Sequence, residues 1–537
     1  MQSLPAEAWH KIHARFPQVE PSGTSPASPK LSQPLPSKQG FHVEVLPGKA
    51  LDGPHDLVPV VVRLSGPDGS EVTKSDFVCI IDISGSMGTE ATIQGAGGEA
   101  ERHGLSLLDV AKHGVRTIAK SLSADDRLCI IAFNHTAAMT LELTKMDEDG
   151  QQKMEDKLDE LNSGGGTDIW TGLAKGLDVL KSDGECVPGA GRFAHIMLLT
   201  DGVSTNANTI VPNLEAFRAK HECLPCTITT FGFGYGIDSR LLQEIAELGD
   251  GSYCFIPDAG FVGTCFVNTM SNLLVAAARE VFLQLEPEDG ASIVAVATGL
   301  VSNNSSDVTT IRLGTLHYGQ SREVVVSMST TKSGPCLTAN ARFLTPVDKV
   351  PQETEASTSP VESSEDVVQP HVCRAKFVDS ILDSMTEASQ SSRLEHITEE
   401  GLASMKDALR LLSEDVRASS ASSSAAVSSL LEDIEGQASE AVSKVEYFRK
   451  WGRHYLPSLM FAHRLQQCNN FKDPGVQAYG GSLFEDVRDR ADENFNKLPA
   501  PKPSVRRVSY SGGGGSYGGG YTAAPVDMSA YNNRYGG

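Results

Sequence analysis

Residues 77–87 read FVCIIDISGSM, and this stretch decides how the rest of the chain is interpreted. Its first five residues are apolar, and such a run followed by polar turn residues predicts a strand that is buried on both faces. Asp82 comes where that strand ends, and Ser84 and Ser86 follow on either side of a glycine. Ligands of open parallel sheets bind beyond the carboxyl ends of the strands. The stretch therefore predicts a buried strand that leads into a polar binding edge.

The segments that follow this strand alternate between short apolar runs and longer segments of helical period. Uninterrupted apolar strands alternating with helices are typical of a mostly parallel sheet covered by helices on both faces. We therefore predict a doubly wound, Rossmann-like α/β domain over residues 76–280. Its further strands are expected at 127–133, 138–143, 195–200, 227–234 and 252–257, and its helices at 105–122, 146–162, 169–180, 238–248 and 261–279.

The chain on both sides of this domain has a different pattern. Residues 40–75 contain two strand-like runs, and residues 281–347 contain further runs of strand length without a helical segment between them. We predict that both sets join in one β-sandwich, so that the α/β domain is inserted in it or, if the early strands lie elsewhere, is followed by it.

The C-terminal part is predicted to be helical. Residues 348–370 are expected to form an acidic linker, and residues 371–498 repeat apolar positions at helical spacing. Within them, the Ser/Ala tract at 419–429 is expected to be a loop between two helices. Trp451, Tyr455 and Phe461 are expected to pack these helices together or onto the sandwich. Residues 1–39 and the Gly/Tyr-rich residues 499–537 lack apolar periodicity, and we expect both to be disordered.

Composition excludes several classes of function. The 537 residues contain 68 acidic and 46 basic side chains, a formal charge of -22, which argues against general binding to nucleic acid or anionic membranes. Neither a secretory signal nor an apolar run of membrane-spanning length is found, so a cytoplasmic location is expected. Four cysteines lie in or next to apolar segments and are expected to be buried free thiols: Cys79, Cys129, Cys254 and Cys265.

Three polar loops carry the chemistry that the sequence suggests. Asp82, Ser84 and Ser86 follow the first strand, Thr167 lies in the string GGGTD before a helix, and Asp201 ends the strand in the string LLTDG. Carboxylate and hydroxyl oxygens are hard ligands that suit Mg²⁺ or Mn²⁺. Because few of these ligands carry formal charge, a bound cation would remain positive enough to attract the Asp or Glu side chain of a partner.

Each of these loops also has a plainer interpretation when it is taken alone. Ser84 and Ser86 fit the capped start of a helix, residues 164–166 fit a flexible glycine loop, and Asp201 fits a turn residue before Gly202. The finding of all three loops in order, each beside the expected strand or helix, favours the metal site.

The three strings DISGS, GGTD and LLTDG resemble the metal-ion-dependent adhesion site of von Willebrand factor A (VWA) domains. The resemblance covers residues 76–280 and implies that the five residues named above are the metal ligands. The string at 451–481 is similar to plant cytosolic proteins in which a VWA-interacting region follows this domain. Some of these, of the wavy-growth type, are ubiquitin ligases with a RING finger before the VWA domain.

Two segments depart from the plant proteins. Residues 1–75 contain no cysteine, so a RING finger is not expected there and ligase activity is not supported. Residues 88–104 form an insertion beside the first metal motif, and their glycines indicate mobility that could cover the ligand face.

Three functions are compatible with these observations. The first is a non-enzymatic module that binds an acidic residue of a partner protein through a divalent cation. The second is a component that recruits substrates for separate ubiquitination machinery, or a relative of a ubiquitin ligase that lacks the RING finger. The third is a metal-dependent hydrolase, for which only His135, beyond the ligands, offers a general base.

Overall fold

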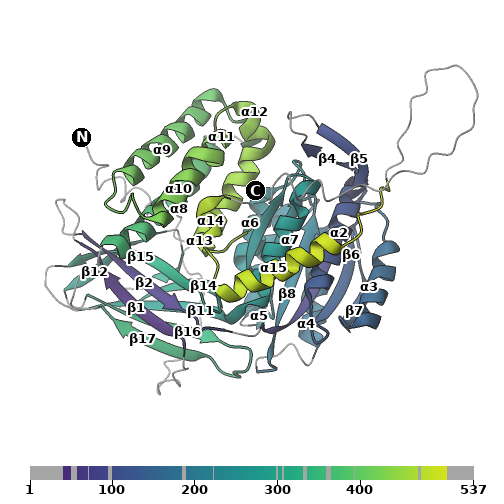
Figure 1. Cartoon of the computed structure of the whole chain (residues 1–537), viewed down its shortest axis with the longest axis horizontal. Coiled ribbons are helices and arrows are strands. Elements are labelled where there is room, and N and C mark those ends of the chain that lie inside the picture. The colour runs from purple at the N-terminus through teal and green to yellow at the C-terminus, as the bar shows by residue number, and fades with distance from the viewer. Residues whose placement is uncertain are drawn as a thin grey trace, which may run out of the picture.

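The computed structural model describes residues 40–504 apart from 50–56, 70–71, 95–99, 184–188, 222, 289, 298–299, 305–307, 331–335, 359–364, 392–393 and 470–472. Three bodies make up the described chain: a β-sandwich, an α/β domain and a group of helices (Figure 1). The predictions of disorder for 1–39 and for most of 499–537 concern residues outside this range.

Six strands form the sheet of the α/β domain, in the order β10-β9-β8-β3-β6-β7. All neighbouring strands run parallel except β6 and β7. The predicted doubly wound, mostly parallel α/β fold is confirmed, and the strand of the opening stretch, β3, lies between β8 and β6. The strands are β3 (Lys74–Asp82), β6 (Arg127–Phe133), β7 (Ala137–Lys145), β8 (Arg192–Thr200), β9 (Thr227–Phe233) and β10 (Asp250–Ile256).

Helices cover both faces of this sheet, and successive side chains of β3 face opposite layers. Val78 and Ile80 pack in the core that contains α4, α5 and α6, whereas Phe77, Cys79 and Ile81 pack in the core that contains α2, α3 and α7. This two-sided burial is why the strand is continuously apolar. The helices are α2 (Leu107–Ser121), α3 (Glu148–Asp159), α4 (Ile169–Ser182), α5 (Ala207–His221), α6 (Ser239–Leu248) and α7 (Val262–Leu274), with short 3-10 turns η1 (Gly85–Gly88) and η2 (Ala259–Phe261).

Two helices differ from the sequence prediction. The pattern predicts a helix over 261–279, but α7 ends at Leu274 and strand β11 (Ala276–Pro287) begins two residues later. Strand β11 begins with three alanines, which are good helix formers, so composition alone did not mark the boundary. The pattern does not predict α5, because Pro212 lies inside it and only Ile210 and Leu214 are buried.

The segment 88–104, which is predicted to be a mobile insertion, contains paired strands in its described residues. Its described residues include β4 (Glu90–Gln94) and most of β5 (Ala100–Ser106), which pair antiparallel with Ser106 opposite Glu90. The hairpin therefore ends at the residue that caps α2, and it begins two residues after the turn η1, which follows β3. Figure 1 shows β4 and β5 beside each other above α2.

The sandwich consists of two sheets, in the orders β1-β2-β15-β12 and β13-β14-β11-β16-β17. Strand β2 pairs antiparallel with β15, with Val62 opposite Val324, so the α/β domain is inserted between strands of the sandwich. Apolar side chains of both sheets pack in one core. The remaining strands are β1 (His42–Pro47), β2 (Leu57–Ser65), β12 (Ala291–Val296), β13 (Val301–Asn304), β14 (Thr309–His317), β15 (Ser321–Thr330), β16 (Leu337–Leu344) and β17 (Gln352–Ser357).

The predicted acidic linker at 348–370 contains regular structure. Strand β17 pairs with β16 at the edge of its sheet, and its residues QETEAS are mostly polar because an edge strand is held by backbone hydrogen bonds. Helix α8 (Glu365–Ser391) then begins before the predicted boundary and includes Pro370.

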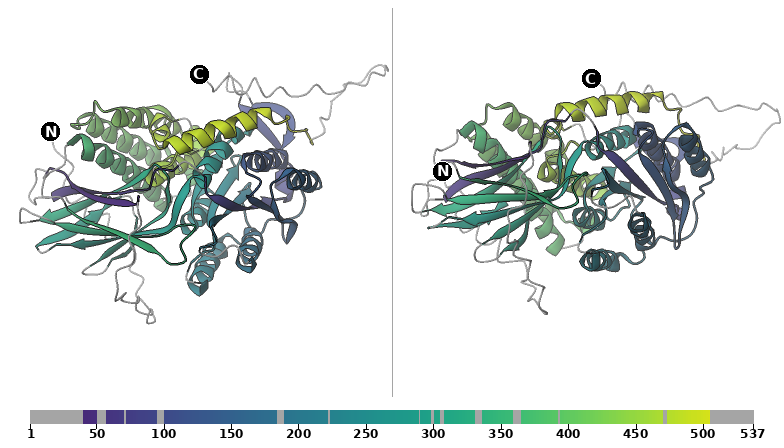
Figure 2. Two further views of the ribbon diagram at one scale, coloured as in Figure 1. Left: turned by 60° about the horizontal axis from the view of Figure 1, so that its bottom comes forward. Right: turned by 90° about the horizontal axis from the view of Figure 1, so that it is seen from below.

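The helical region follows from α8 onward. The Ser/Ala tract is only partly a loop, because α10 begins at Ala425 with Ser424 as its N-cap. Tyr455 and Phe461 are buried among the helices as predicted, and Trp451 is half-buried. The region contains η4 (Leu394–His396), α9 (Glu399–Arg417), α10 (Ala425–Asp433), η5 (Ile434–Ala438), α11 (Ser439–Ala441), α12 (Val445–Tyr447), η6 (Phe448–Gly452), α13 (Arg453–Leu465), α14 (Pro474–Gln477) and α15 (Ser482–Lys497). The last helix, α15, leaves this group and lies across α7 and α2 (Figure 2).

Four cysteines are buried free thiols, as predicted: Cys79, Cys129, Cys254 and Cys265.

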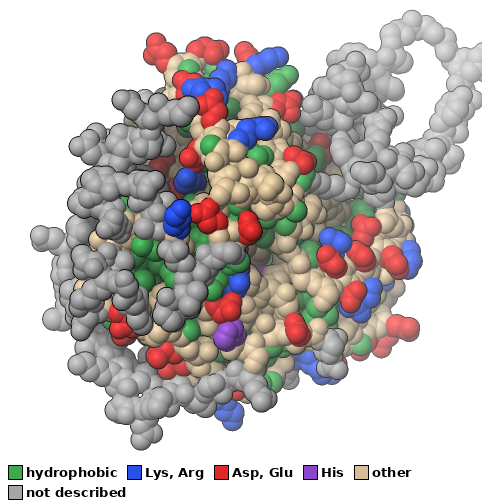
Figure 3. Space-filling model, turned by 60° about the vertical axis from the view of Figure 1, so that its left-hand side comes forward, with side chains coloured by type: hydrophobic (Ala, Val, Ile, Leu, Met, Phe, Trp, Pro, Cys, Tyr) green, Lys and Arg blue, Asp and Glu red, His purple; other side chains and the backbone are tan. Residues whose placement is uncertain are grey.

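On the face of the molecule shown in Figure 3, acidic and basic side chains are interspersed rather than gathered by sign. Within the described ranges, no helix is both long and apolar enough to cross a membrane.

Candidate metal site at the edge of the α/β sheet

Asp82 and Thr200 lie side by side where the neighbouring strands β3 and β8 end. The register places Ile81 opposite Leu199, one residue before each of them. Asp82 is fully buried, and its two carboxylate oxygens have different donors. The backbone N of Ser84 donates to Asp82 Oδ1 at 2.8 Å, and Thr200 Oγ1 donates to Asp82 Oδ2 at 2.6 Å. These bonds fix the orientation of the carboxylate.

The loop after β3 brings two hydroxyl groups together. Ser84 stands at the N-cap of the 3-10 turn η1, and the backbone N of Met87 donates to Ser84 O at 3.1 Å. The turn places Ser84 Oγ 3.1 Å from Ser86 Oγ. Ser84 is buried whereas Ser86 is exposed, so the hydroxyl pair leads from the interior to the surface.

The glycine-rich loop before α4 lies between the other two loops. Gly85 N donates to Gly165 O at 3.0 Å, which joins it to the first loop. The carbonyl of Thr167 accepts from Thr205 N at 3.1 Å, which joins it to the segment after Asp201. Gly165 has a φ of +87°, and a Cβ there would approach the side chains of Asn134 and His135. The three predicted loops therefore meet at one edge.

Burial and mutual repulsion act on the two carboxylates of the site. Burial raises the pKa of Asp82 to about 6 and the negative charge of Asp201 adds to this, while hydrogen bonds from Ser84 and Thr200 oppose it. Burial also raises the pKa of Asp201, and a hydrogen bond from Ser86 opposes the rise. Neither carboxylate pairs with a lysine or arginine among the described residues. A bound cation would relieve this unfavourable burial of charge.

The structure brings the five predicted residues to one edge with different degrees of contact. Asp82, Ser84, Ser86 and Asp201 form a chain of direct interactions. Thr167 is buried and is placed by its backbone. Two carboxylates and three hydroxyls are a hard oxygen donor set, which fits Mg²⁺ or Mn²⁺. The described residues contain no cluster of three or more His, Cys, Asp or Glu side chains, so hydroxyl ligands are essential to this assignment.

Two further residues support the site without having been predicted. Thr200 binds Asp82 directly, and its place just before Asp201 in the string LLTDG was the available signal. Asn134, at the end of β6, donates from Nδ2 to Gly164 O at 3.0 Å and so holds the glycine loop. The adjacent His135 is exposed in the turn between β6 and β7.

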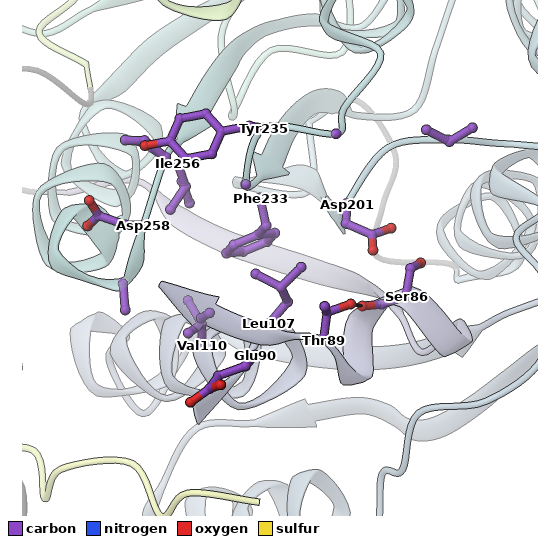
Figure 4. Close-up of a pocket in the computed structure, with 16 residues that line it drawn as sticks. Ser86, Thr89, Glu90, Leu107, Val110, Asp201, Phe233, Tyr235, Ile256 and Asp258 are labelled. Atoms are coloured by element: carbon purple, nitrogen blue, oxygen red, sulfur yellow. Dashed lines mark hydrogen bonds between the residues drawn. The ribbon is translucent and has the colours of Figure 1, made fainter. Parts of the chain in front are cut away.

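An apolar groove with a volume of about 380 Å³ adjoins the site and shares Ser86 and Asp201 with it. Its apolar surface comes from α2 and from the ends of β9 and β10, and Tyr235 and Asp258 lie at the end away from Asp201 (Figure 4). The apolar side chains that line this groove include Leu107, Val110, Phe233 and Ile256.

The helical region holds one wall of the apolar groove. Arg453 Nη2 donates to Tyr235 O at 3.3 Å, and His454 Nε2 lies 3.2 Å from the same oxygen. The start of α13 therefore fixes the loop that follows β9, which carries Tyr235 and Gly236. The groove is thus shaped by both the α/β domain and the helical region.

Two regions of the chain match known protein families. Residues 77–203 match the von Willebrand factor type A domain, and residues 424–493 match the family described as VWA / Hh protein intein-like. The chain thus contains a VWA-type domain, which a sandwich and C-terminal helices accompany.

Two individual proteins are similar to part of this chain. The chain is 25% identical over 320 residues to the E3 ubiquitin-protein ligase WAV3 of Arabidopsis thaliana, a match that covers 55% of this chain and 38% of the relative. It is 26% identical over 232 residues to an uncharacterized protein of Synechocystis, which covers 41% of this chain and 53% of the relative. The chain thus spans well under two thirds of either relative.

A solved structure supports the fold. The von Willebrand factor type A protein from Catenulispora acidiphila superposes with a TM-score of 0.52 at 15% identity, covering 75% of this chain and 91% of that one. At this identity the likeness concerns the fold alone.

Proposed function

We propose that this chain is a protein-interaction module whose five site residues hold Mg²⁺ or Mn²⁺ and thereby bind an Asp or Glu side chain of a partner protein. The observation that carries the proposal is the pair of carboxylates, Asp82 and Asp201, that lie beside hydroxyl groups at a strand edge without a basic partner in the described chain. The match of residues 77–203 to the VWA domain supports it.

The chain's own residues prepare the site for this role. Thr200 and the backbone of Ser84 hold the Asp82 carboxylate in place, so little ordering is needed when a ligand binds. Exposed Ser86 and half-buried Asp201 open the site to the surface and to the apolar groove. When bound, the cation supplies positive charge and a coordination position for an oxygen atom from outside the chain.

Calorimetric titration of Mg²⁺ and Mn²⁺ into the full chain tests the metal site. We expect saturable binding to the wild type and to Asp178→Ala, which removes an exposed carboxylate from α4, and no binding to Asp82→Ala. Proteins retained by the wild type with Mg²⁺, but lost with EDTA or with Asp201→Ala, would then be identified by mass spectrometry. Equal metal binding by wild type and Asp82→Ala would refute the assignment.

The similarity to the Arabidopsis ligase favours a second candidate function. We infer that the module could recruit substrates for ubiquitination, because the 320 matched residues belong to a protein named as a ligase. The chain would then increase ubiquitination of a captured partner when a separate RING ligase is present. Conjugates formed by the purified chain with only the activating and conjugating enzymes would instead show that it is a ligase itself.

A further inference from the structure

The C-terminal end of the described chain runs along α2 toward the metal-site edge. Asn494 Nδ2, near the end of α15, donates to Lys120 O at 3.0 Å, close to the C-terminal end of α2. The next residue, Phe495, packs against the ring of His113 in the middle of α2, with ring centroids 5.4 Å apart. The chain therefore runs antiparallel to α2, from its far end toward its first turn (Figure 2).

Ser504 is fixed at that first turn. Its backbone N and its Oγ donate to Asp109 Oδ2 at 3.1 and 2.6 Å, and its Oγ also lies 3.0 Å from the Oγ of Ser106, the N-cap of α2. Leu107 and Val110 of the same turn line the apolar groove. Because a helical turn rises about 5.4 Å, the chain beyond Ser504 starts close to this groove.

The sequence beyond Ser504 contains a single acidic side chain. Within residues 505–537, Asp527 is the only Asp or Glu, and it stands between Val526 and Met528 in the string APVDMSA. This sequence complements the surface of the site. Its carboxylate would meet the metal ligands, and its apolar side chains would meet the groove that adjoins them.

We propose that the segment 522–531 of this chain is an internal ligand of its own metal site. The Asp527 carboxylate occupies the coordination position that a partner's Asp or Glu would take, and Val526 or Met528 enters the apolar groove. This inference rests on the proposed function, because it uses the same cation. A partner must then displace the chain's own segment in order to bind.

The length of the connecting sequence suits this role. Residues 505–526 number 22, and seven of them are glycines. A glycine-rich chain of this length spans about 25 Å on average and at most about 75 Å, which exceeds the rise of one helical turn, about 5.4 Å, over which α2 carries both the partners of Ser504 and two residues of the groove. Tethering of this kind gives an effective concentration on the order of 1 mM. A weak contact is therefore occupied when no competitor is present.

A labelled peptide with the sequence of residues 522–531, TAAPVDMSAY, provides the probe. Its binding to the full chain is followed by fluorescence anisotropy, with Mg²⁺ and with EDTA. For a peptide Kd of about 0.1 mM, the internal segment should weaken binding to the wild type about tenfold. We therefore expect Asp527→Asn to bind the peptide about tenfold more tightly than the wild type, and only with Mg²⁺. Asp527→Glu, which keeps a carboxylate, is expected to resemble the wild type.

Several outcomes would overturn the proposal. These are equal peptide affinity for wild type and Asp527→Asn, no binding to Asp527→Asn, or binding that persists in EDTA. A difference that vanishes on dilution together with a dimer in size-exclusion chromatography would assign the segment to a second copy. If calorimetry finds no Mg²⁺ binding at all, it is the proposed function that fails.

The contribution of the apolar groove is tested separately at Gly236. A Cβ at this exposed glycine would meet no atom within 4 Å, so Gly236→Trp can place an indole at the groove without displacing the backbone. We expect Gly236→Trp in the Asp527→Asn background to weaken the peptide at least fivefold while Mg²⁺ affinity is retained. Leu411→Trp, at a residue that is 47% exposed on α9, is the matched control. Unchanged peptide affinity in Gly236→Trp would remove the groove from the proposal.

Discussion

Asp76 and Asp82 stand near the two ends of the same strand, β3, and both are fully buried, yet their partners differ. Asp76 is held by Arg127, whose Nε and Nη2 lie 2.8 and 2.7 Å from its two carboxylate oxygens. Arg192 adds a third contact, with Nε 3.0 Å from Asp76 Oδ1. Among the described residues, the hydrogen-bond donors to Asp82 are Ser84 and Thr200, and neither of them is basic.

This difference in partners distinguishes a carboxylate that stabilises the fold, Asp76, from one that is suited to bind a cation, Asp82. A buried charge is costly unless it is paired and hydrogen-bonded. At Asp76 the chain supplies two guanidinium groups, whereas at Asp82 burial raises the pKa to about 6 and no basic side chain of the described residues compensates. The strand therefore carries a complete ion pair at its start and a negative site that suits an external cation at its end.

The largest effect is expected from breaking the ion pair. Asp76→Asn removes the carboxylate that both guanidinium groups contact and leaves Asp183 as a carboxylate partner of Arg127, so we expect it to lower the free energy of unfolding by about 3 kcal/mol. Asp82→Asn removes an unpaired buried charge, so in EDTA it should change that free energy by less than about 1 kcal/mol or raise it. Urea denaturation measures both. Similar losses in the two variants would contradict the comparison.

The buried imidazole of His113 should have a smaller effect on the free energy of unfolding, and this effect should depend on pH. His113 of α2 is buried against Phe495, and its Nδ1 has no hydrogen-bond partner among the described residues. Burial lowers its pKa to about 4, and repulsion from Arg116 adds to this effect. Since this pKa lies below the unfolded value of about 6.5, the unfolded state takes up the proton first. Stability is therefore complete above pH 6.5 and falls as the pH drops toward 4, by up to about 3 kcal/mol.

Replacement of the imidazole isolates this contribution. His113→Phe keeps an aromatic ring against Phe495 and removes the titrating group, so the loss of stability between pH 6.5 and 4 should become smaller by that amount. Thermal unfolding of both proteins across this range provides the measurement. If the variant follows the pH profile of the wild type, His113 does not account for the acid sensitivity.

The sequence predicted well those elements whose burial is visible as a pattern of apolar and polar residues. The continuous apolar runs around Cys79 and Leu198 gave the parallel strands, and the polar loops at Ser84 and Asp201 gave the binding edge. Elements that are held by backbone hydrogen bonds or tertiary contacts have a weaker pattern of apolar residues in the sequence. Strand β17 is polar because it lies at an edge, and α5 buries only two apolar side chains.

The sequence predicted which residues form the site, but it did not predict which side chain contacts which. Both Thr200 and Thr167 are threonines next to an aspartate, yet only the Thr200 side chain binds Asp82 in the structure, because β3 and β8 are neighbours in this register. Likewise, no local pattern indicates that Ser504 reaches Asp109, which is 395 residues away. Such contacts depend on how the domains pack.

The smallest effect should come from a residue that positions Asp82 without being a ligand. Thr200→Val keeps the shape of the side chain but removes the hydroxyl that binds Asp82 Oδ2, so we expect Mg²⁺ affinity to fall about tenfold. Thr230→Val is the matched control, because Thr230 is equally buried on the neighbouring strand β9 and donates to Leu242 O at 2.9 Å. Both variants should lose about 1 kcal/mol of stability, but only Thr200→Val should weaken Mg²⁺ in calorimetry. A similar Mg²⁺ affinity in both would mean that the hydrogen bond at Asp82 serves the fold, as the arginine contacts of Asp76 do, and does not prepare a metal ligand.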